Sequence, residues 1–419
     1  MTSNEKTSSI EGFYKKSLEE RLSLLQSFAG LSDGEIALLK KTGSLDFETA
    51  NRMVENVFST HPLPLGIATN FKINGKEVLI PFAIEEPSVV AAASNAAKLC
   101  RDSGGFSAEA DDAIMFGQIQ LVRVPNPDAA VKKIIESKKL LLDAAKSKDS
   151  TIVKLGGGPV DLTARVLDTP RGKMVVAVLE VNVLDAMGAN AVNTMCEALA
   201  PTLEELTGGK ALLRIISNLA TKRLVRAKAV WTKKALEESV KGEVNGEDVV
   251  DGILDAWAFA YADVYRAATH NKGIMNGIDA VVVATGNDWR AAEAGAHAFA
   301  SLSGKYLPLT KYSKDKEGNL VGEIELPVVV ATFGGATKTH PLAQIALKIL
   351  GVKSAKELAC VIASVGLANN FAALRALSTE GIQKGHMKLH AKNVAVMAGA
   401  KGKQIDIIAE KLIAGKNVS

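Results

Sequence analysis

The sequence predicts an α+β protein, with a large mixed α/β domain of helices around buried strands and a smaller domain inserted into it. A chain of 419 residues is too long for one hydrophobic core. A β-α-β-β-α-β pattern fills residues 112–216, and helices and apolar runs of a different style flank it. We therefore expect the large domain in two parts, residues 1–111 and 217–377, and a mobile helical C-terminal flap at 378–419.

The composition is that of an ordinary globular protein, with 47% hydrophobic and 23% charged residues. The net charge of +4 is mild and the lysines are scattered, so we expect no nucleic-acid partner. Cys100, Cys196 and Cys360 lie far apart without metal-binding spacing, which predicts reduced core thiols in a cytoplasmic protein. No apolar run approaches the roughly 18 residues of a membrane span, and the polar start does not resemble a signal peptide.

The N-terminal region is predicted to be helical and then to form a hairpin. Two Ser-x-x-Glu sequences, beginning at Ser17 and Ser32, have the spacing of capping boxes. Asn74-Gly75 separates the alternating runs 66–73 and 77–83, which is a strong hairpin signal.

The sequence EEPS at 85–88 joins this hairpin to an alanine-rich helix. Pro87 suits the first helical position, so Glu86 and Ser88 could serve only as helix caps. Two acids before a proline exceed what capping requires, and this favours a functional role for Glu86.

The inserted domain follows the order of a ferredoxin-like fold. Its predicted elements are a strand at 114–124, a helix from Asn126-Pro127, strands at 162–167 and 174–183, a helix at 186–206 and a strand at 212–216. The second helix opens with DAMGAN at 185–190, where a glycine in the first turn lets a ligand approach free N–H groups. The same segment could be only a closely packed helix start. No G-x-G-x-x-G sequence occurs, so a Rossmann site is not expected.

The stretch 267–288 is the predicted centre of the chemistry. We expect a polar, glycine-rich loop with Lys272, then a short buried strand at Ile278–Ala284, then a turn that ends at Asp288. A single lysine beside a core element is usually a solvated loop residue. Here several histidine and asparagine side chains surround one apolar run, and polar groups so close to a core need partners or a ligand.

The C-terminal segment contains His386 and His390, four residues apart. A metal site would need a third ligand with suitable spacing, and the sequence offers none, so no metal is expected. Glycines precede and follow His386, which predicts a mobile element. A histidine on such an element is often incidental, but it can also deliver a proton after closure.

Together these segments resemble the class II hydroxymethylglutaryl-CoA (HMG-CoA) reductases. The matching sequences are ENV at 55–57, EEPSVVAAAS at 85–94, DAMGANAVNTM at 185–195, RIISNLA at 214–220, YRAATHNKGIMNGID at 265–279, ATGNDWRAAEAGAHA at 284–298, GGATKTHPLA at 334–343 and TEGIQKGHMKLHAKN at 379–393. They span nearly the whole chain in the order of the family.

The resemblance implies a two-step hydride transfer that interconverts (S)-HMG-CoA and (R)-mevalonate plus CoA through mevaldehyde, in mevalonate synthesis or breakdown. The implied catalytic residues are Glu86, Lys272, Asp288 and His386. The implied substrate contacts are Ser88, Asn218, Arg266 and Asn276. The implied cofactor contacts are Asp149, Asp185, Met187, Gly188 and Asn190. The family further suggests homodimers, often three in a hexamer.

The implied reaction requires these residue types. An ammonium such as Lys272 stabilises the negative oxygen that hydride addition creates. Glu86 can protonate that oxygen only if its pKa is raised; a helix N-terminus acts in the opposite direction, so we expect Asp288 to raise it. The three groups then titrate as one unit. His386 would protonate the CoA thiolate.

The cofactor is expected to be NADH, with NADPH as the alternative. A carboxylate at Asp149 can bind the ribose 2′-OH and repel a 2′-phosphate, whereas Lys146 and Lys148 could bind that phosphate. Two other classes of protein compete with a reductase. A non-redox CoA-dependent acyl transferase would not oxidise reduced nicotinamide. An RNA-binding ferredoxin-like domain would need exposed aromatics, and residues 112–216 contain only Phe116.

Overall fold

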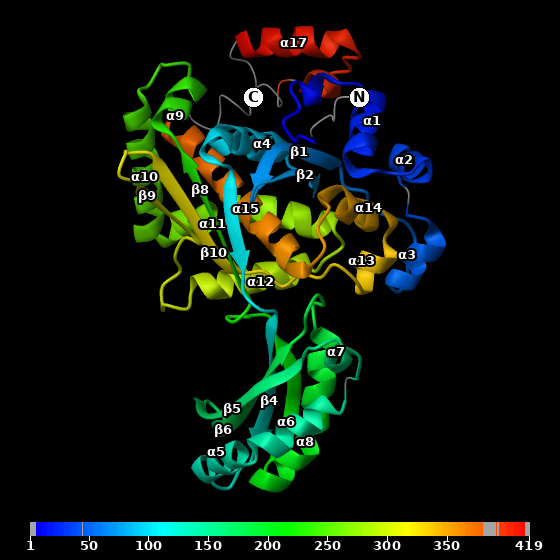
Figure 1. Ribbon diagram of the computed structural model, residues 1–419, viewed down its shortest axis with the longest axis vertical. Helices are drawn as coiled ribbons and strands as arrows, with labels where there is room; N and C mark the ends of the chain where they lie inside the picture. Colours follow the sequence, from blue (N-terminus) through cyan, green and yellow to red (C-terminus); the bar gives the residue numbers. More distant parts are fainter. Residues whose placement is uncertain (1–5, 44, 149, 380–390, 392–393, 415–419) are drawn as a thin grey trace.

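The protein consists of a large body and a smaller one that projects from it (Figure 1). The computed structural model describes residues 6–43, 45–148, 150–379, 391 and 394–414. Each body is built on its own sheet, one of six strands and one of four. The α+β class predicted from the sequence is confirmed.

The large body is organised on the six-stranded sheet. Its strand order is β2 (Lys76–Ala83), β1 (Leu65–Ile73), β3 (Phe106–Ala110), β8 (Leu224–Trp231), β10 (Leu320–Pro327) and β9 (Thr310–Lys314). Strands β1 and β3 are parallel, and the other neighbours are antiparallel. The predicted hairpin is β1–β2, and Asn74 and Gly75 both have the positive φ that a two-residue turn of this kind requires.

Three helices pack with this sheet to form the main core: α4 (Val89–Cys100), α11 (Val264–Ala284) and α15 (Ala355–Ser378). Trp231 of β8 stacks on Phe371 of α15, with ring centroids 3.9 Å apart. By length and hydropathy α15 could cross a membrane, so the expectation that no segment has such a length is wrong. Since 83% of its apolar window is buried inside the protein, α15 has the character of a core helix.

The remaining helices surround this core. They are α1 (Leu18–Ala29), α2 (Asp33–Lys40), α3 (Phe47–Met53), α9 (Lys233–Ser239), α10 (Gly246–Ala262), α12 (Trp289–Ala300), α13 (Gly335–Thr339), α14 (Pro341–Leu350) and α17 (Lys403–Ala414). The capping boxes predicted at Ser17 and Ser32 are both present, at the starts of α1 and α2. Short 3₁₀ turns occur at Phe13–Lys15 and Arg101–Ser103.

The strand predicted at Ile278–Ala284 is wrong, because these residues form the last two turns of α11. Lys272 therefore lies on a helix and not in a loop. Helix α11 packs against α15, α10, β2 and α12, so its apolar run is buried on several sides. A short apolar run of this kind cannot be assigned to strand or helix by periodicity alone. Gly277 allows the close approach of α15: a Cβ there would lie 2.2 Å from Asn369 Oδ1.

The small body has the predicted ferredoxin-like order. Its antiparallel sheet runs β5 (Gly158–Thr169), β6 (Gly172–Asn182), β4 (Ile114–Val122) and β7 (Lys210–Ser217). Helices α5 (Pro127–Glu136), α6 (Lys138–Lys146) and α8 (Ala189–Thr207) pack on it, and the short α7 (Ser150–Lys154) precedes β5. The exact domain limits and the C-terminal flap remain predictions, and much of the flap lies outside the described residues.

The chain passes between the two bodies at neighbouring points, once after β3 and once before β8. Ala110 of β3 pairs with Val225 of β8, so the two connections leave the large sheet side by side. The backbone N–H of Asp111 also donates to Leu224 O at 2.9 Å. The junction between the bodies is thus a paired ribbon, and Arg223 is buried within it.

Candidate active site

Glu86, Lys272 and Asn276 meet on the outer face of α11. Lys272 Nζ lies 2.6 Å from Glu86 Oε2, and Asn276 Nδ2 donates to Glu86 Oε1 at 3.3 Å. Lys272 and Asn276 are one helical turn apart and so share a face. The side chains of Lys272 and Glu86 are 59% and 35% exposed, so this ion pair remains accessible to a substrate.

The loop that carries Glu86 has an unusual backbone. Ser88, directly before α4, adopts φ 75° and ψ −18°, a left-handed conformation that costs a non-glycine residue about 1–2 kcal/mol. The capping interpretation is wrong for Ser88, because its side chain makes no capping bond, and Pro87 lies before the helix and not at its first position. Asn369 of α15 donates to Val89 O at 3.1 Å and supports this turn. Local strain held by the surrounding core is typical of functional sites.

Arg266 lies in the first turn of the same helix, α11, and is half-buried. Among the described residues its guanidinium has no hydrogen-bond or ion-pair partner, and burial lowers its pKa. An unpaired arginine of this kind suits a carboxylate ligand. One turn later, burial and the charge of Arg266 lower the pKa of His270 to about 3, so His270 is neutral; its Nε2 lies 2.7 Å from Thr310 Oγ1.

Asp288 belongs to a different part of the structure. It caps α12, accepting from Ala291 N–H at 3.1 Å, and contacts Arg290 at 3.4 Å. In the described part of the chain it makes no hydrogen bond or ion pair with Glu86 or Lys272. A helix rises about 1.5 Å per residue, so Lys272 lies roughly 18 Å before the end of α11, and Asp288 lies beyond that end. One chain therefore does not bring the predicted catalytic acids together.

Asn218 and the predicted cofactor loop lie on the same side as Asp288. The backbone of Asn218 packs on α12, since a Cβ at Gly295 would be 2.7 Å from Asn218 O. Asn287 bonds through its amide to the backbone N and O of Ala331. The neighbouring Thr332 N–H donates to Asp185 O at 3.3 Å.

The loop between β6 and α8 offers a polar ligand an open helix end. Gly188 precedes α8 with φ 98°, no side chain caps the helix, and its first turn has no acidic residue. Asn190 is exposed, whereas Met187 packs on the small-domain core. Asp185 is already engaged, because its Oδ1 accepts from Ala355 N–H at 2.7 Å. The free N–H groups after Gly188 and the exposed Asn190 could therefore bind the amide or a phosphate of a nicotinamide cofactor. Asp185 is less suited to this, because its carboxylate is already bonded.

Two predicted site residues cannot be placed. Asp149 and His386 lie outside the described residues, and their roles stay predictions from the sequence.

Sequence reasoning missed two polar features, one buried and one half-buried. Arg223 lies in a short basic segment, TKR, and nothing local marks it as buried. The second feature links α11 to α12: burial raises the pKa of Asp279 to about 8, and neighbouring Glu293 acts in the same direction. Glu293 lies 2.5 Å from His297 Nε2, whose Nδ1 lies 2.8 Å from the Tyr306 hydroxyl. The one-turn spacing of Glu293 and His297 is the signal that could have revealed this chain.

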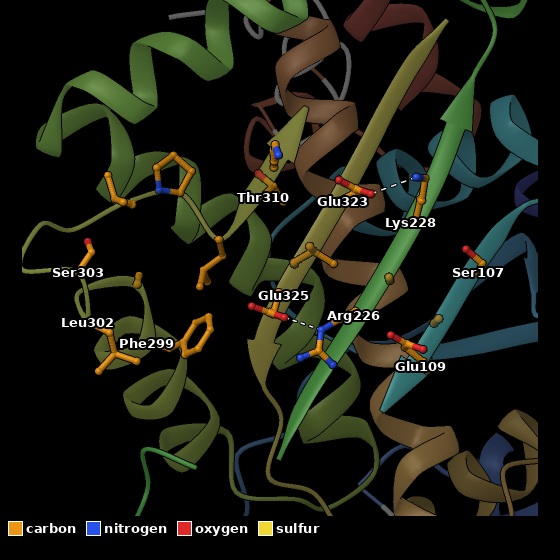
Figure 2. A pocket seen from close by; sticks show the side chains of 18 of the residues that line it. Ser107, Glu109, Arg226, Lys228, Phe299, Leu302, Ser303, Thr310, Glu323 and Glu325 are labelled. Carbon is orange, nitrogen blue, oxygen red and sulfur yellow. Dashed lines mark hydrogen bonds and ion pairs between the residues drawn. The ribbon is translucent and has the colours of Figure 1, made fainter. Parts of the chain in front are cut away.

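A cavity of about 820 Å³ lies elsewhere, between strands β3, β8 and β10 and the segment after α12 (Figure 2). Its charged side chains are largely paired across strands: Arg226 with Glu325 at 2.5 Å and Lys228 with Glu323 at 3.1 Å. Such a ladder is ordinary for the outer face of a sheet. The open Glu86–Lys272 pair is therefore a stronger candidate for a reaction centre than this cavity.

Comparisons with known proteins identify the family to which the chain belongs. Residues 17–391 match the family model for hydroxymethylglutaryl-coenzyme A reductase. The 3-hydroxy-3-methylglutaryl-coenzyme A reductase of Archaeoglobus fulgidus is 57% identical, over 97% of this chain and 91% of its own length. A solved class II reductase from Streptococcus pneumoniae, bound to NADPH in open conformations, has a TM-score of 0.83 and 46% identity, covering 95% of this chain and 96% of that chain.

The chain is thus an oxidoreductase with a ferredoxin-like domain inserted into a larger α/β domain. It belongs to the hydroxymethylglutaryl-coenzyme A reductase family. This membership confirms the resemblance and argues against the two alternatives, an acyl transferase and an RNA-binding protein.

Proposed function

We propose that Glu86, Lys272 and Asn276 form the reaction centre at which this reductase interconverts HMG-CoA and mevalonate. The observation that carries the proposal is the exposed 2.6 Å contact of Lys272 with Glu86. Lys272 shares helix α11 with Arg266, whose guanidinium has no partner among the described residues. The test is an assay of the purified protein in both directions with both nicotinamide cofactors. Absence of HMG-CoA-dependent oxidation of either reduced cofactor would reject the proposal.

The proposed role of each residue follows from the chemistry of its side chain. Lys272 stabilises the oxygen that becomes negative at the thioester and again at the aldehyde. Glu86 gives the proton to that oxygen, and Asn276 holds the other carboxyl oxygen of Glu86. Arg266 and Ser88 bind the far carboxylate of the HMG group. The reduced nicotinamide supplies the hydride when it is bound.

We propose further that two copies of the chain complete each site. Within one copy, Asp288, Asn218 and the cofactor loop lie together at α12, away from Glu86 and Lys272. A second copy that presents its Asp288 to Glu86 would favour the protonated form of Glu86.

Mixing Lys272→Ala and Asp288→Ala proteins tests this shared site. If two copies contribute, exchange of subunits restores activity that neither variant has alone. If each copy holds a whole site, the mixture stays inactive. The family resemblance further suggests that such dimers assemble into hexamers.

The cofactor preference rests on a residue outside the described part of the chain. We propose that Asp149 favours NADH, and that Asp149→Asn improves kcat/KM for NADPH more than for NADH. The solved Streptococcus pneumoniae relative is bound to NADPH, which supports the opposite preference. A wild-type protein with the higher kcat/KM for NADPH would reject the assignment of Asp149.

We propose that His386 protonates the leaving CoA thiolate and that the enzyme acts in the cytoplasm. The free, buried cysteines support a reducing compartment. His386→Gln should slow the conversion of HMG-CoA much more than the reduction of mevaldehyde, which releases no thiolate. Equal losses in the two half-reactions would instead give His386 a role in ordering the pocket.

A further inference from the structure

Arg223 is a buried cation whose side-chain hydrogen bonds, within the described part of the chain, are all to backbone carbonyl groups. Its side chain lies in the junction between the two bodies, and the residue is only 6% exposed. Nη1 lies 3.1 Å from Ala186 O and 3.4 Å from Met187 O, and Nη2 donates to Val330 O at 2.6 Å. Burial lowers the pKa of Arg223 to about 10, against the charge of Asp185, so the side chain stays protonated at neutral pH.

These carbonyls belong to two different segments. Ala186 and Met187 lie in the loop 184–188, which precedes the open N-terminus of α8. Val330 follows β10 of the large sheet. The planar guanidinium can bond both segments at once because its donors point in several fixed directions. Arg223 therefore fastens the loop before α8 to the large domain.

Two further contacts hold the same loop to the large domain. Asp185 Oδ1 accepts from Ala355 N–H at the start of α15, and Asp185 O accepts from Thr332 N–H. The segment after β10 in turn enters the small-domain core through Val329, which is 2% exposed. The loop 184–188 is thus bonded to the large domain at several points, although it belongs to the small domain in sequence.

We propose that Arg223 is a positioning residue that fixes the nicotinamide end of the cofactor relative to the large domain. This inference rests on the proposed role of residues 185–190 in cofactor binding. Without the arginine, three carbonyl groups lose their buried donor and the loop keeps only the two Asp185 contacts to the large domain. The hydride donor and its acceptor must be held in a narrow range of geometry, and a misplacement of about 1 Å can cost on the order of 100-fold in rate.

The test compares Arg223→Met and Arg223→Lys with Arg226→Met. Arg226 is a matched control because it lies three residues further along the same chain segment but forms ion pairs with Asp111 and Glu325 on the outer sheet face. For Arg223→Met we expect kcat to fall about 10- to 100-fold and KM for the reduced cofactor to rise about tenfold, with KM for HMG-CoA nearly unchanged. Arg223→Lys keeps the positive charge but loses the planar guanidinium with its several fixed donors. Its kcat and its KM for the reduced cofactor should therefore lie between those of wild type and Arg223→Met.

Amide hydrogen exchange gives a second readout that does not depend on turnover. Exchange at residues 185–190 should be faster in Arg223→Met and Arg223→Lys than in wild type or Arg226→Met, while strands β5 and β6 stay protected. An unchanged cofactor KM together with unchanged exchange in Arg223→Lys would overturn the inference. Exchange could increase in the variants while the wild-type protein shows no HMG-CoA-dependent oxidation of reduced cofactor. In that case Arg223 does attach the loop 184–188 to the large domain, and the proposed function is wrong.

Discussion

Two ion pairs lie at opposite ends of strand β2, and they differ in almost every respect except distance. Glu77, near the start of the strand, contacts Arg101 at 2.7 Å. Glu86, just beyond the end of the strand, contacts Lys272 at 2.6 Å. The side chains of the first pair are both 19% exposed, whereas those of the second are 35% and 59% exposed. The length of the contact alone therefore does not separate a structural ion pair from one that is proposed to react.

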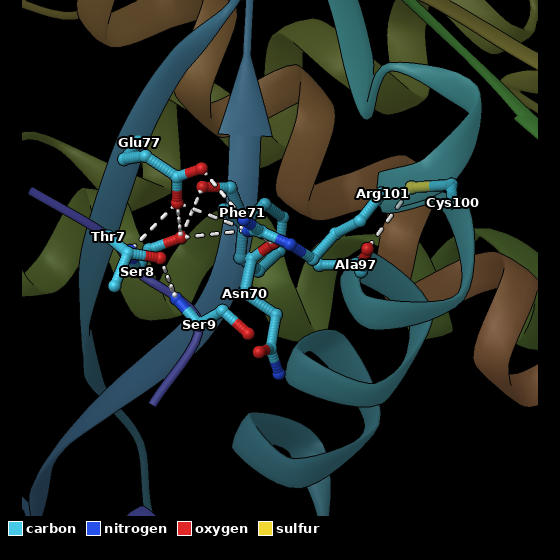
Figure 3. Close-up of polar contacts among 9 residues, drawn as sticks. All are labelled: Thr7, Ser8, Ser9, Asn70, Phe71, Glu77, Ala97, Cys100 and Arg101. Carbon is cyan, nitrogen blue, oxygen red and sulfur yellow. Dashed lines mark hydrogen bonds and ion pairs between the residues drawn. The ribbon is translucent and has the colours of Figure 1, made fainter. Parts of the chain in front are cut away.

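The surroundings do separate them. The Glu77 carboxylate accepts from both terminal nitrogens of Arg101 and from the backbone N–H of Ser8, and the Ser8 hydroxyl lies 2.6 Å away (Figure 3). Arg101 also donates to Asn70 O at 2.8 Å. This cluster ties the N-terminal segment to the hairpin and leaves little capacity for a ligand. Glu86 and Lys272 keep unused donors and acceptors, which a substrate can occupy.

The largest expected effect is at the open pair. Lys272→Ala should reduce kcat for HMG-CoA reduction by about 100-fold or more, because the developing oxyanion loses its cation. The melting temperature should change little, since an exposed ion pair contributes only about 0–1 kcal/mol to stability. Steady-state kinetics and thermal unfolding of the same preparation provide the measurement. A folded Lys272→Ala protein that retains most of its turnover would contradict the assigned role.

The closed pair should show the opposite behaviour. Arg101→Met leaves a half-buried carboxylate without its cation, and we expect a loss of about 1–3 kcal/mol in the free energy of unfolding. The kcat of the folded protein should stay close to the wild-type value, because the cluster lies at the other end of β2. Chemical denaturation at neutral pH measures the first quantity. A large drop in kcat without loss of stability would mean that the two ends of β2 are coupled.

The same cluster predicts an acid-dependent stability. Burial alone would raise the pKa of Glu77, but hydrogen bonds from Arg101 and Ser8 outweigh it and lower the pKa to about 2. A depressed pKa means that the stabilisation is fully present above the unfolded pKa of about 4.5 and is lost as the pH falls towards 2. The difference in stability between wild type and Glu77→Gln should therefore shrink over that interval.

Some elements of the fold and the site could be predicted from the sequence, and others could not. The hairpin, the capping boxes and the ferredoxin-like order were predictable because each follows from local spacing. Helix α11 was mistaken for a loop and a strand because its apolar end is buried on several sides. The meeting of Glu86 with Lys272 joins residues 186 positions apart, and only the family resemblance indicated it. Arg223 could not be found, since a basic loop residue gives no local sign of burial.

A smaller effect is expected at the half-buried acid pair formed by Asp279 of α11 and Glu293 of α12. Because the folded pKa of Asp279 is raised to about 8, its contribution to stability is fully present below the unfolded value near 3.8 and is lost as the pH rises through 8. Asp279→Asn keeps a hydrogen-bond donor towards Glu293 without a titrating proton. The variant should gain stability relative to wild type as the pH rises from about 4 to 8, by at most about 1.4 kcal/mol per pH unit, and should gain no more above pH 8. Asp168→Asn, at an exposed position on β5, is the control and should show no such trend.

The smallest effect is expected for a third pair, Lys228 and Glu323, on the ladder beside the 820 Å³ cavity. Their side chains are 52% and 43% exposed, so water and salt screen the attraction. A double-mutant cycle with Lys228→Met and Glu323→Gln should give a coupling energy below about 1 kcal/mol, and activity should be unchanged. The cycle for Glu77→Gln and Arg101→Met should give a clearly larger coupling. If instead the Lys228–Glu323 coupling matched that of the buried cluster, this face of the sheet would have to be shielded from water in solution, as it would be if a second copy of the chain covered it.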